Sequence, residues 1–140
     1  MSNARYLIPL IMLVLLTACA TTPEPEPLES SPEISALVQQ ADEYRQQGDY
    51  ARAQSLLERA LRIDARNPRT WYELASLKLD AGALDSAETF ARKSLRYSGE
   101  SSREAAQNWL LISEIRRRLG DDSGAKAAQQ KAKAIGRSLK

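Results

Sequence analysis

The chain has 140 residues, of which 43% are hydrophobic and 27% charged, the length and composition of about one globular domain. It holds no histidine and a single cysteine, which excludes histidine-based catalytic triads, metal sites built from histidine or several cysteines, and internal disulfides. The formal net charge of +2 is too small to indicate a nucleic-acid partner. Aromatic residues make up 6%, and alanine and leucine supply most of the apolar content, which favours a helical fold.

Residues 1–18 have the pattern of a secretory signal peptide. Arg5 supplies a positive charge, and residues 7–16 are apolar apart from Pro9. A helix of about ten residues spans only ~15 Å, half the hydrocarbon core of a bilayer. We therefore expect a cleaved signal peptide and not a transmembrane helix.

The signal peptide runs into Leu16-Thr17-Ala18-Cys19, which resembles the lipobox of bacterial lipoproteins. The resemblance implies diacylglyceryl transfer to the Cys19 sulfur, cleavage before Cys19 and acylation of the new amine. Two or more acyl chains anchor a protein stably to a membrane. Ala20 stands where an aspartate commonly retains lipoproteins at the inner membrane, so the resemblance favours the periplasmic face of the outer membrane. The alternative is an ordinary secreted protein with an incidental cysteine.

Residues 19–33 are predicted to be the lipidated cysteine and an extended tether. The segment mixes prolines with glutamates: Pro23, Pro25, Pro27 and Pro32 with Glu24, Glu26, Glu29 and Glu33. Proline fixes the backbone and removes hydrogen-bond donors, and the like charges repel one another. About fourteen residues at ~3.1 Å each in polyproline II reach roughly 40 Å. The alternative is a proline-rich ligand for a partner protein.

The rest of the chain contains an internal repeat. Gly48 and Gly82 are 34 residues apart, and Gly82 and Gly120 are 38 apart, the same spacing as Trp71 to Trp109. A period of 34 residues with paired helices is the signature of tetratricopeptide repeats (TPRs). The predicted repeats are about 34–67, 68–101 and 106–138, within a domain of residues 34–140.

The residues of each repeat resemble the TPR family pattern. The matching positions are Leu37, Ala41, Tyr44, Gly48, Ala53, Leu57 and Ala60 in the first repeat, Trp71, Leu74, Ala75, Gly82, Leu84, Ala87, Ala91 and Ser94 in the second, and Trp109, Ile112, Ser113, Gly120, Ala125 and Ala132 in the third. The third repeat departs with Arg116 where a tyrosine is expected and with Gln129 at a usual packing position. The resemblance implies an all-α fold of three helix-turn-helix repeats in a short right-handed solenoid.

Six helices are expected, near residues 34–47, 50–64, 68–81, 84–97, 102–118 and 122–138. The repeated glycine stands where each first helix must end, in a left-handed conformation. Asn67 and Pro68 can cap and start the third helix, and Ser101 with Glu104 has the spacing of a capping box for the fifth. The last helix has an apolar side that we expect to pack inward or, alternatively, to dock a partner or second copy: Ala125, Ala128, Ala132 and Ile135.

Three short motifs resemble fragments of catalytic, metal-binding or nucleic-acid-binding sites, but their positions in these helices explain them better. Ser123 and Lys126 have the S-x-x-K spacing of serine acyl enzymes, but no S-D-N or K-T-G element accompanies them. The acidic pair 121–122 and the arginines 116–118 fit the dipole of helix ends. We therefore expect no enzyme activity, no metal, no nucleic acid or small-molecule substrate, and no cofactor apart from the covalent lipid on Cys19.

Proteins of the TPR family bind segments of their partners in a groove lined by the first helix of each pair. The family's groove positions correspond in this sequence to Val38 and Asp42 and to the predicted contact residues Arg45, Arg69, Tyr72, Ser76, Leu79, Leu110, Glu114, Arg117 and Arg118. TPRs that clamp a C-terminal carboxylate use lysine and asparagine at positions that are here Val38, Asp42, Tyr72 and Ser76, so binding of chaperone tails is not supported.

The whole layout of lipobox, tether and a few repeats resembles the LpoP family of short TPR lipoproteins. The resemblance implies a protein-binding module that activates a bifunctional class A penicillin-binding protein, a peptidoglycan synthase, from the outer membrane. Two alternatives stay open at this point. One is a pilotin-like assembly factor for a secretin or pilus, and the other is a generic periplasmic scaffold or protease adaptor.

Overall fold

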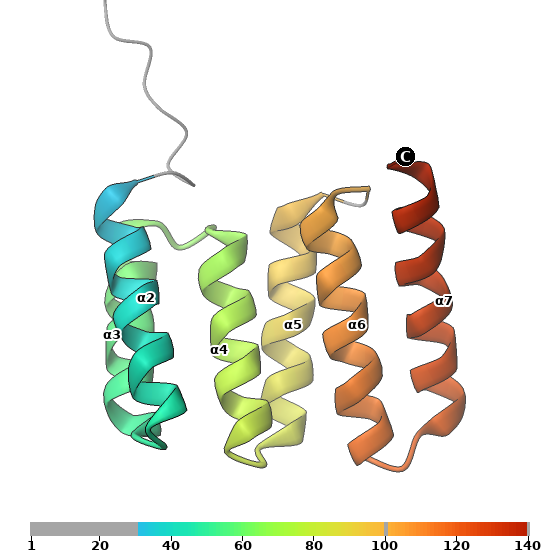
Figure 1. The fold of residues 1–140 in the computed structure, drawn as a ribbon, viewed down its shortest axis with the longest axis horizontal. Coiled ribbons are helices and arrows are strands. Elements are labelled where there is room, and N and C mark those ends of the chain that lie inside the picture. Colours follow the sequence, from blue (N-terminus) through green and yellow to red (C-terminus); the bar gives the residue numbers. More distant parts are fainter. Residues whose placement is uncertain (1–30, 100, 140) are drawn as a thin grey trace, which may run out of the picture.

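The computed structural model describes residues 31–99 and 101–139, so the predicted signal peptide, Cys19 and most of the predicted tether lie outside the described residues. All regular structure in the described residues is helical, which confirms the all-α prediction (Figure 1). The helices are α2 (Pro32–Gln46), α3 (Tyr50–Ile63), α4 (Pro68–Asp80), α5 (Leu84–Ser98), α6 (Arg103–Arg118) and α7 (Asp122–Ser138). None of them is both long and apolar enough to cross a membrane.

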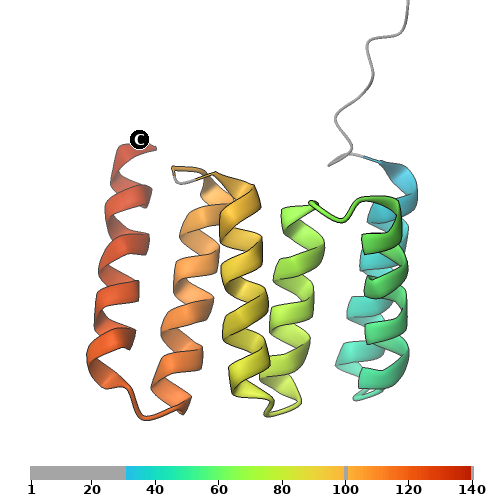
Figure 2. The ribbon, with the colours of Figure 1, turned by 180° about the vertical axis from the view of Figure 1, so that it is seen from behind.

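The helices form three helix-turn-helix pairs that follow one another in a row, as the view from behind also shows (Figure 2). The pairs are α2 with α3, α4 with α5, and α6 with α7, and the contacts within each pair are extensive. Between pairs, α3 packs on α4 and α5 packs on α6. The first helices also contact each other, α2 with α4 and α4 with α6, so they share one side of the array.

Glycine ends the first helix of each pair. Gly48, Gly82 and Gly120 have φ angles of 78°, 75° and 81°, the left-handed conformation predicted for them. The next amide closes the turn onto a carbonyl five residues back, as from Asp49 to Tyr44 at 2.9 Å. Asp49 then caps α3 by accepting a hydrogen bond from a backbone amide of the first turn. The turn and the start of the next helix are therefore built from one short run of residues.

Two helix starts differ from the sequence-based prediction. Helix α2 begins at Pro32 and not at residue 34, because a proline at the first helical position lacks an N–H that would have no partner there. The last two residues of the predicted tether are thus the first turn of α2. The predicted capping box at Ser101 is wrong: Ser102 is the N-cap of α6, and its Oγ accepts a hydrogen bond from the Ala105 amide at 3.0 Å.

The start of α4 follows the prediction. Asn67 is the N-cap and Pro68 the first helical residue. The Asn67 Oδ1 accepts hydrogen bonds from the Thr70 amide at 2.9 Å and from the Thr70 hydroxyl at 3.1 Å. Both side chains are buried, so this cap also fixes the connection between the first two repeats.

Small residues let the helices approach closely and larger ones fill the spaces between them. One buried cluster joins α2, α3 and α4, and a second joins α4 to α7, with fully buried Ile112 and Ile115 at its centre. Phe90 packs against both clusters and contacts the Trp71 ring in a tilted arrangement, with the ring centroids 5.6 Å apart. The alanine side of α7 faces inward as predicted, while Gln129 is exposed because no described helix packs on the outer side of α7.

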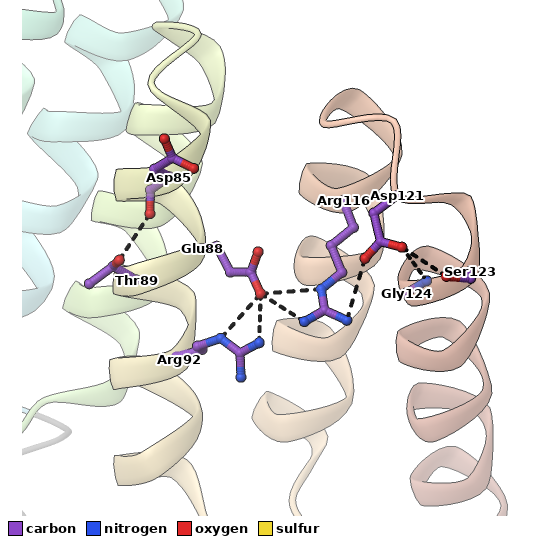
Figure 3. A network of polar contacts seen from close by, with 8 residues as sticks. All are labelled: Asp85, Glu88, Thr89, Arg92, Arg116, Asp121, Ser123 and Gly124. Carbon is purple, nitrogen blue, oxygen red and sulfur yellow. Dashed lines mark hydrogen bonds and ion pairs between the residues drawn. The ribbon is translucent and has the colours of Figure 1, made fainter.

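Arg116, which stands where the TPR pattern has tyrosine, ties three helices together (Figure 3). Its guanidinium donates hydrogen bonds to the Glu88 carboxylate of α5 at 3.0 and 3.2 Å. The same guanidinium lies 3.9 Å from the carboxylate of Asp121, the N-cap of α7. Arg92 supplies a second guanidinium to Glu88 at 2.6 Å. A polar network thus replaces the packing of an aromatic ring at this position.

Candidate protein-binding groove

The first helices form a groove of about 780 Å³ on the side that they share. Its lining comes from α2, α4, the turn before α4 and one residue of α6: Ile34, Ser35, Val38, Gln39, Asp42, Arg45, Asn67, Arg69, Tyr72, Glu73, Ser76, Leu79, Asp80 and Leu111. The helical period explains the selection, because residues three and four apart lie on one face of a helix. The lining mixes charged, polar and apolar side chains, as expected for a surface that recognises a protein segment.

A second hollow of about 480 Å³ continues from this groove between α4, the end of α5 and the start of α6. Four residues line both spaces: Asn67, Arg69, Tyr72 and Glu73. One face of α4, together with the residue before it, therefore forms a wall that the groove and the second hollow share.

Five of the predicted contact residues line the groove: Arg45, Arg69, Tyr72, Ser76 and Leu79. Leu79 is only 5% exposed and belongs to the core, so it presents little surface to a ligand. Val38 and Asp42 line the groove as well. The structure therefore brings together the predicted residues of the first two repeats.

The four predicted contact residues on α6 line neither hollow. The Leu110 side chain is 52% exposed, and its neighbour Leu111 is the residue that reaches the groove. Glu114 accepts hydrogen bonds from Arg117 and Arg118 of its own helix, and these bonds lower its pKa to about 2. The third repeat thus presents a cluster of ion pairs outside both hollows, from which Arg118 also donates to the Leu79 carbonyl of α4 at 3.4 Å.

Arg45 organises the α2 side of the groove. Its guanidinium donates hydrogen bonds to Asp42 on α2 and to Asp80 on α4, and so links the two helices. The hydrogen bond from Arg45 is the main reason that the pKa of Asp42 lies below its ordinary value. Across the groove, burial raises the pKa of the Tyr72 phenol, which therefore stays protonated and able to donate a hydrogen bond at neutral pH.

Glu73 is the most enclosed carboxylate of this surface. Its side chain is 16% exposed, and burial raises its pKa above the ordinary value of 4.5. The nearest cation is Arg69, whose Nε lies 3.8 Å from the carboxylate. This distance makes an ion pair but exceeds a hydrogen bond, so the charge on Glu73 is weakly compensated.

Comparisons with known proteins identify the fold and the family of this chain. The profile of the tetratricopeptide-repeat family matches residues 44–110. A solved structure, that of the globular C-terminal domain of P. aeruginosa LpoP, is 37% identical in sequence and superposes with a TM-score of 0.70. The match covers 73% of this chain and 96% of the LpoP domain. The chain belongs to the LpoP-like TPR proteins. No curated protein matches its sequence.

The LpoP-like fold makes this chain a TPR protein-interaction module. The groove offers carboxylates, guanidinium groups and a phenol, which recognise side chains and backbone amides through hydrogen bonds and ion pairs. Among the described residues, no group of three or more histidine, cysteine, aspartate or glutamate side chains is placed to hold a metal ion.

Sequence reasoning missed seven residues of the groove lining: Ile34, Ser35, Gln39, Asn67, Glu73, Asp80 and Leu111. A signal for Glu73 was present, because it lies four residues after Arg69 and three before Ser76 and so shares their helix face. Asn67 was identified as a cap, and its second role in the groove wall depends on the path of the turn. Leu111 could be separated from Leu110 only once the rotation of α6 was known.

Proposed function

We propose that this LpoP-like protein is an outer-membrane lipoprotein, anchored through Cys19, that binds and activates a bifunctional class A penicillin-binding protein. The observation that carries the proposal is the match to LpoP over 96% of that domain at 37% identity, in a chain whose first helices form a groove. The lipobox supports the anchor, and the proline- and glutamate-rich segment after Cys19 supports a tether that extends the domain into the periplasm.

Activation requires that the groove bind one conformation of the synthase more tightly than another. A ligand shifts a conformational equilibrium only by its difference in affinity for the two states. A tenfold change in that equilibrium corresponds to about 1.4 kcal/mol, which a few groove contacts supply. No catalytic group of the TPR domain takes part in this scheme.

The test is capture of the partner from crosslinked cells with the lipidated protein, followed by mass spectrometry. The groove variant carries Arg69→Ala and Tyr72→Ala. A matched control carries Arg66→Ala and Tyr97→Ala, an arginine and a tyrosine that contact each other outside both hollows. We expect a class A synthase with the wild type and the control, and at least tenfold less with the groove variant.

Purified synthase in lipid then gives the functional readout. The wild-type protein should raise the rate of glycan polymerisation, and the groove variant should not. Capture of a secretin, a pilus component or a protease in place of a synthase would favour the assembly factor or the scaffold. Replacement of Cys19 by serine should release the protein from the outer-membrane fraction, and its retention there would contradict the proposed anchor.

A further inference from the structure

The point where the two hollows meet has an unusual electrostatic balance. Asp42 and Asp80, two other carboxylates of the larger groove, both accept hydrogen bonds from Arg45. Among the described residues, no donor forms a hydrogen bond to Glu73, and the side chain of its ion-pair partner Arg69 is 73% exposed. An exposed ion pair is worth little, so the half-buried charge on Glu73 lacks the compensation that such groups usually have.

A second acceptor without a donor lies in the wall of the smaller hollow. The Asn108 side chain is fully buried, and its amide Nδ2 donates to the Ser94 hydroxyl at 2.8 Å and to the Glu104 carbonyl at 3.0 Å. Within the part of the chain that the structure describes, its Oδ1 accepts no hydrogen bond. Buried polar atoms are nearly always paired, so this buried acceptor, in a residue of the hollow's wall, is a second group on this surface whose hydrogen-bonding capacity is unmet.

The Glu73 carboxylate and the Asn108 Oδ1 are both hydrogen-bond acceptors without a donor in the described part of the chain, and the carboxylate is also negatively charged. Arg69 and Arg103 also line this hollow, but both are exposed and well hydrated, and an anionic ligand would gain little from them. For Glu73 much of the loss of hydration has already occurred in the free protein, so of the two partners only the incoming cation has still to lose most of its water when the pair forms.

We propose that the smaller hollow receives a lysine or arginine side chain from an extended segment of the partner, and that its cationic end pairs with Glu73. The inference rests on the proposed function only in taking the groove as the partner-binding surface. It adds the chemistry of the residue recognised there. The larger groove would hold the neighbouring residues of the same segment, since the two spaces share the wall formed by α4.

The probe is a displayed library of random peptides, selected on the purified protein, on Glu73→Gln and on the control Glu43→Gln. Glu43 is an exposed glutamate of α2 that lines neither hollow. We expect lysine or arginine to be enriched at one position of the selected peptides with the wild type and the control, and this preference to be lost with Glu73→Gln. A selected peptide should bind about tenfold more weakly once its basic residue is replaced by glutamine, and the Glu73→Gln variant should bind both peptides equally.

Four results would overturn the inference: no selected peptides, no preference, a preference for acidic residues, or a basic preference that survives in Glu73→Gln. Thermal unfolding of the three proteins separates binding from folding, because relief of a buried charge should leave Glu73→Gln at least as stable as the wild type. If basic peptides bind at Glu73 but the synthase does not bind at all, the proposed function fails while this inference stands. If the synthase binds but the selected peptides show no basic preference, the inference fails while the proposed function stands.

Discussion

Glu73 and Glu88 are two largely buried carboxylates that differ in how well nearby guanidinium groups compensate their charge. Their side chains are 16% and 19% exposed. Burial raises the pKa of Glu73, since the nearby guanidinium groups do not offset it. Burial would raise the pKa of Glu88 too, but hydrogen bonds from Arg92 and Arg116 outweigh it and leave that pKa below 4.5. Glu88 is therefore fully compensated within the fold, whereas Glu73 is not, which is the contrast on which the proposed ligand pairing rests.

Replacement of Glu88 by glutamine should lower the free energy of unfolding by about 1–3 kcal/mol at neutral pH, because it removes two charge-assisted contacts. The folded-state pKa of Glu88 is lowered, so its contribution is present above about pH 4.5 and is lost as the pH falls. Urea unfolding of wild type and Glu88→Gln at several pH values should show a difference in unfolding free energy that becomes smaller at acidic pH. Glu58→Gln, at an exposed glutamate of α3, serves as the control. A difference that stays constant from pH 7 to pH 3 would contradict this account.

Ser94 joins the second and third repeats through one hydroxyl. It donates to the Pro68 carbonyl at 2.7 Å and accepts from the Asn108 amide at 2.8 Å, and both side chains are fully buried. Ser94→Ala leaves an acceptor and a donor unpaired in the interior, so we expect a loss of about 1–3 kcal/mol in unfolding free energy. Ser86→Ala, on the exposed face of the same helix, should change it by less than about 0.5 kcal/mol. Equal effects of the two changes in chemical denaturation would rule out the network as a source of stability.

At the scale of elements, the chain offers two glycines with opposite roles around α7. Gly120 has a φ of 81° at the turn, whereas Gly136 is helical and nothing lies within 4 Å of a Cβ built there. Gly120→Ala should destabilise by about 1 kcal/mol or more because it forces alanine into the left-handed region. Gly136→Ala should stabilise by up to about 0.5–1 kcal/mol through helix propensity. Shifts in the same direction in thermal unfolding would contradict the assigned conformations.

The helices could be predicted closely from the sequence because local signals determine their ends. The spacing of Gly48, Gly82 and Gly120 gave the turns, and Asn67 followed by Pro68 gave the start of α4. The connection between α5 and α6 could not be predicted as well. A further glycine with positive φ, Gly99, ends α5 outside the repeat period, and adjacent serines offer two possible caps that differ only in how the chain approaches α6.

The groove was predictable in outline and not in detail. Arg45, Arg69 and Tyr72, chosen from the family positions, line one groove, because helical period sets the face of each helix and the repeat brings α2 beside α4. The importance of Glu73 depends on how deeply its carboxylate is enclosed and on which guanidinium reaches it. The role of Arg116 depends on Glu88, 28 residues earlier in the chain. Such pairings between helices have no signature in a single sequence.

Over the whole molecule, the two sets of helices differ in charge. The first helices α2, α4 and α6 carry seven basic and seven acidic residues, whereas the second helices α3, α5 and α7 carry ten and four. The groove therefore lies on the balanced side, and the excess positive charge lies on the other set. A basic side chain approaching Glu73 is attracted by Glu73 and Glu104 and repelled by Arg69 and Arg103, which line the same hollow, so the local charge is balanced, while the second helices with their net positive charge disfavour the same ligand.

The stacking of three pairs also predicts how the array fails. Ala128 of α7 packs in the cluster that holds Ile112 and Ile115, so a chain ending at Gly120 would expose the part of this cluster that α7 covers, at about 25 cal/mol per Å² of apolar surface. In a repeat array, the free energy of unfolding is approximately the sum of the intrinsic stabilities of the helix pairs and of the interfaces between them. A third repeat reduced to α6 alone loses the interface between α6 and α7. We expect the truncated chain to lose its cooperative thermal transition by circular dichroism and to bind a hydrophobic dye. A chain ending at Ser138, which keeps the whole of α7, should unfold like the full-length protein. If the chain that ends at Gly120 unfolds at the same temperature as that control, α7 does not belong to the cooperative unit.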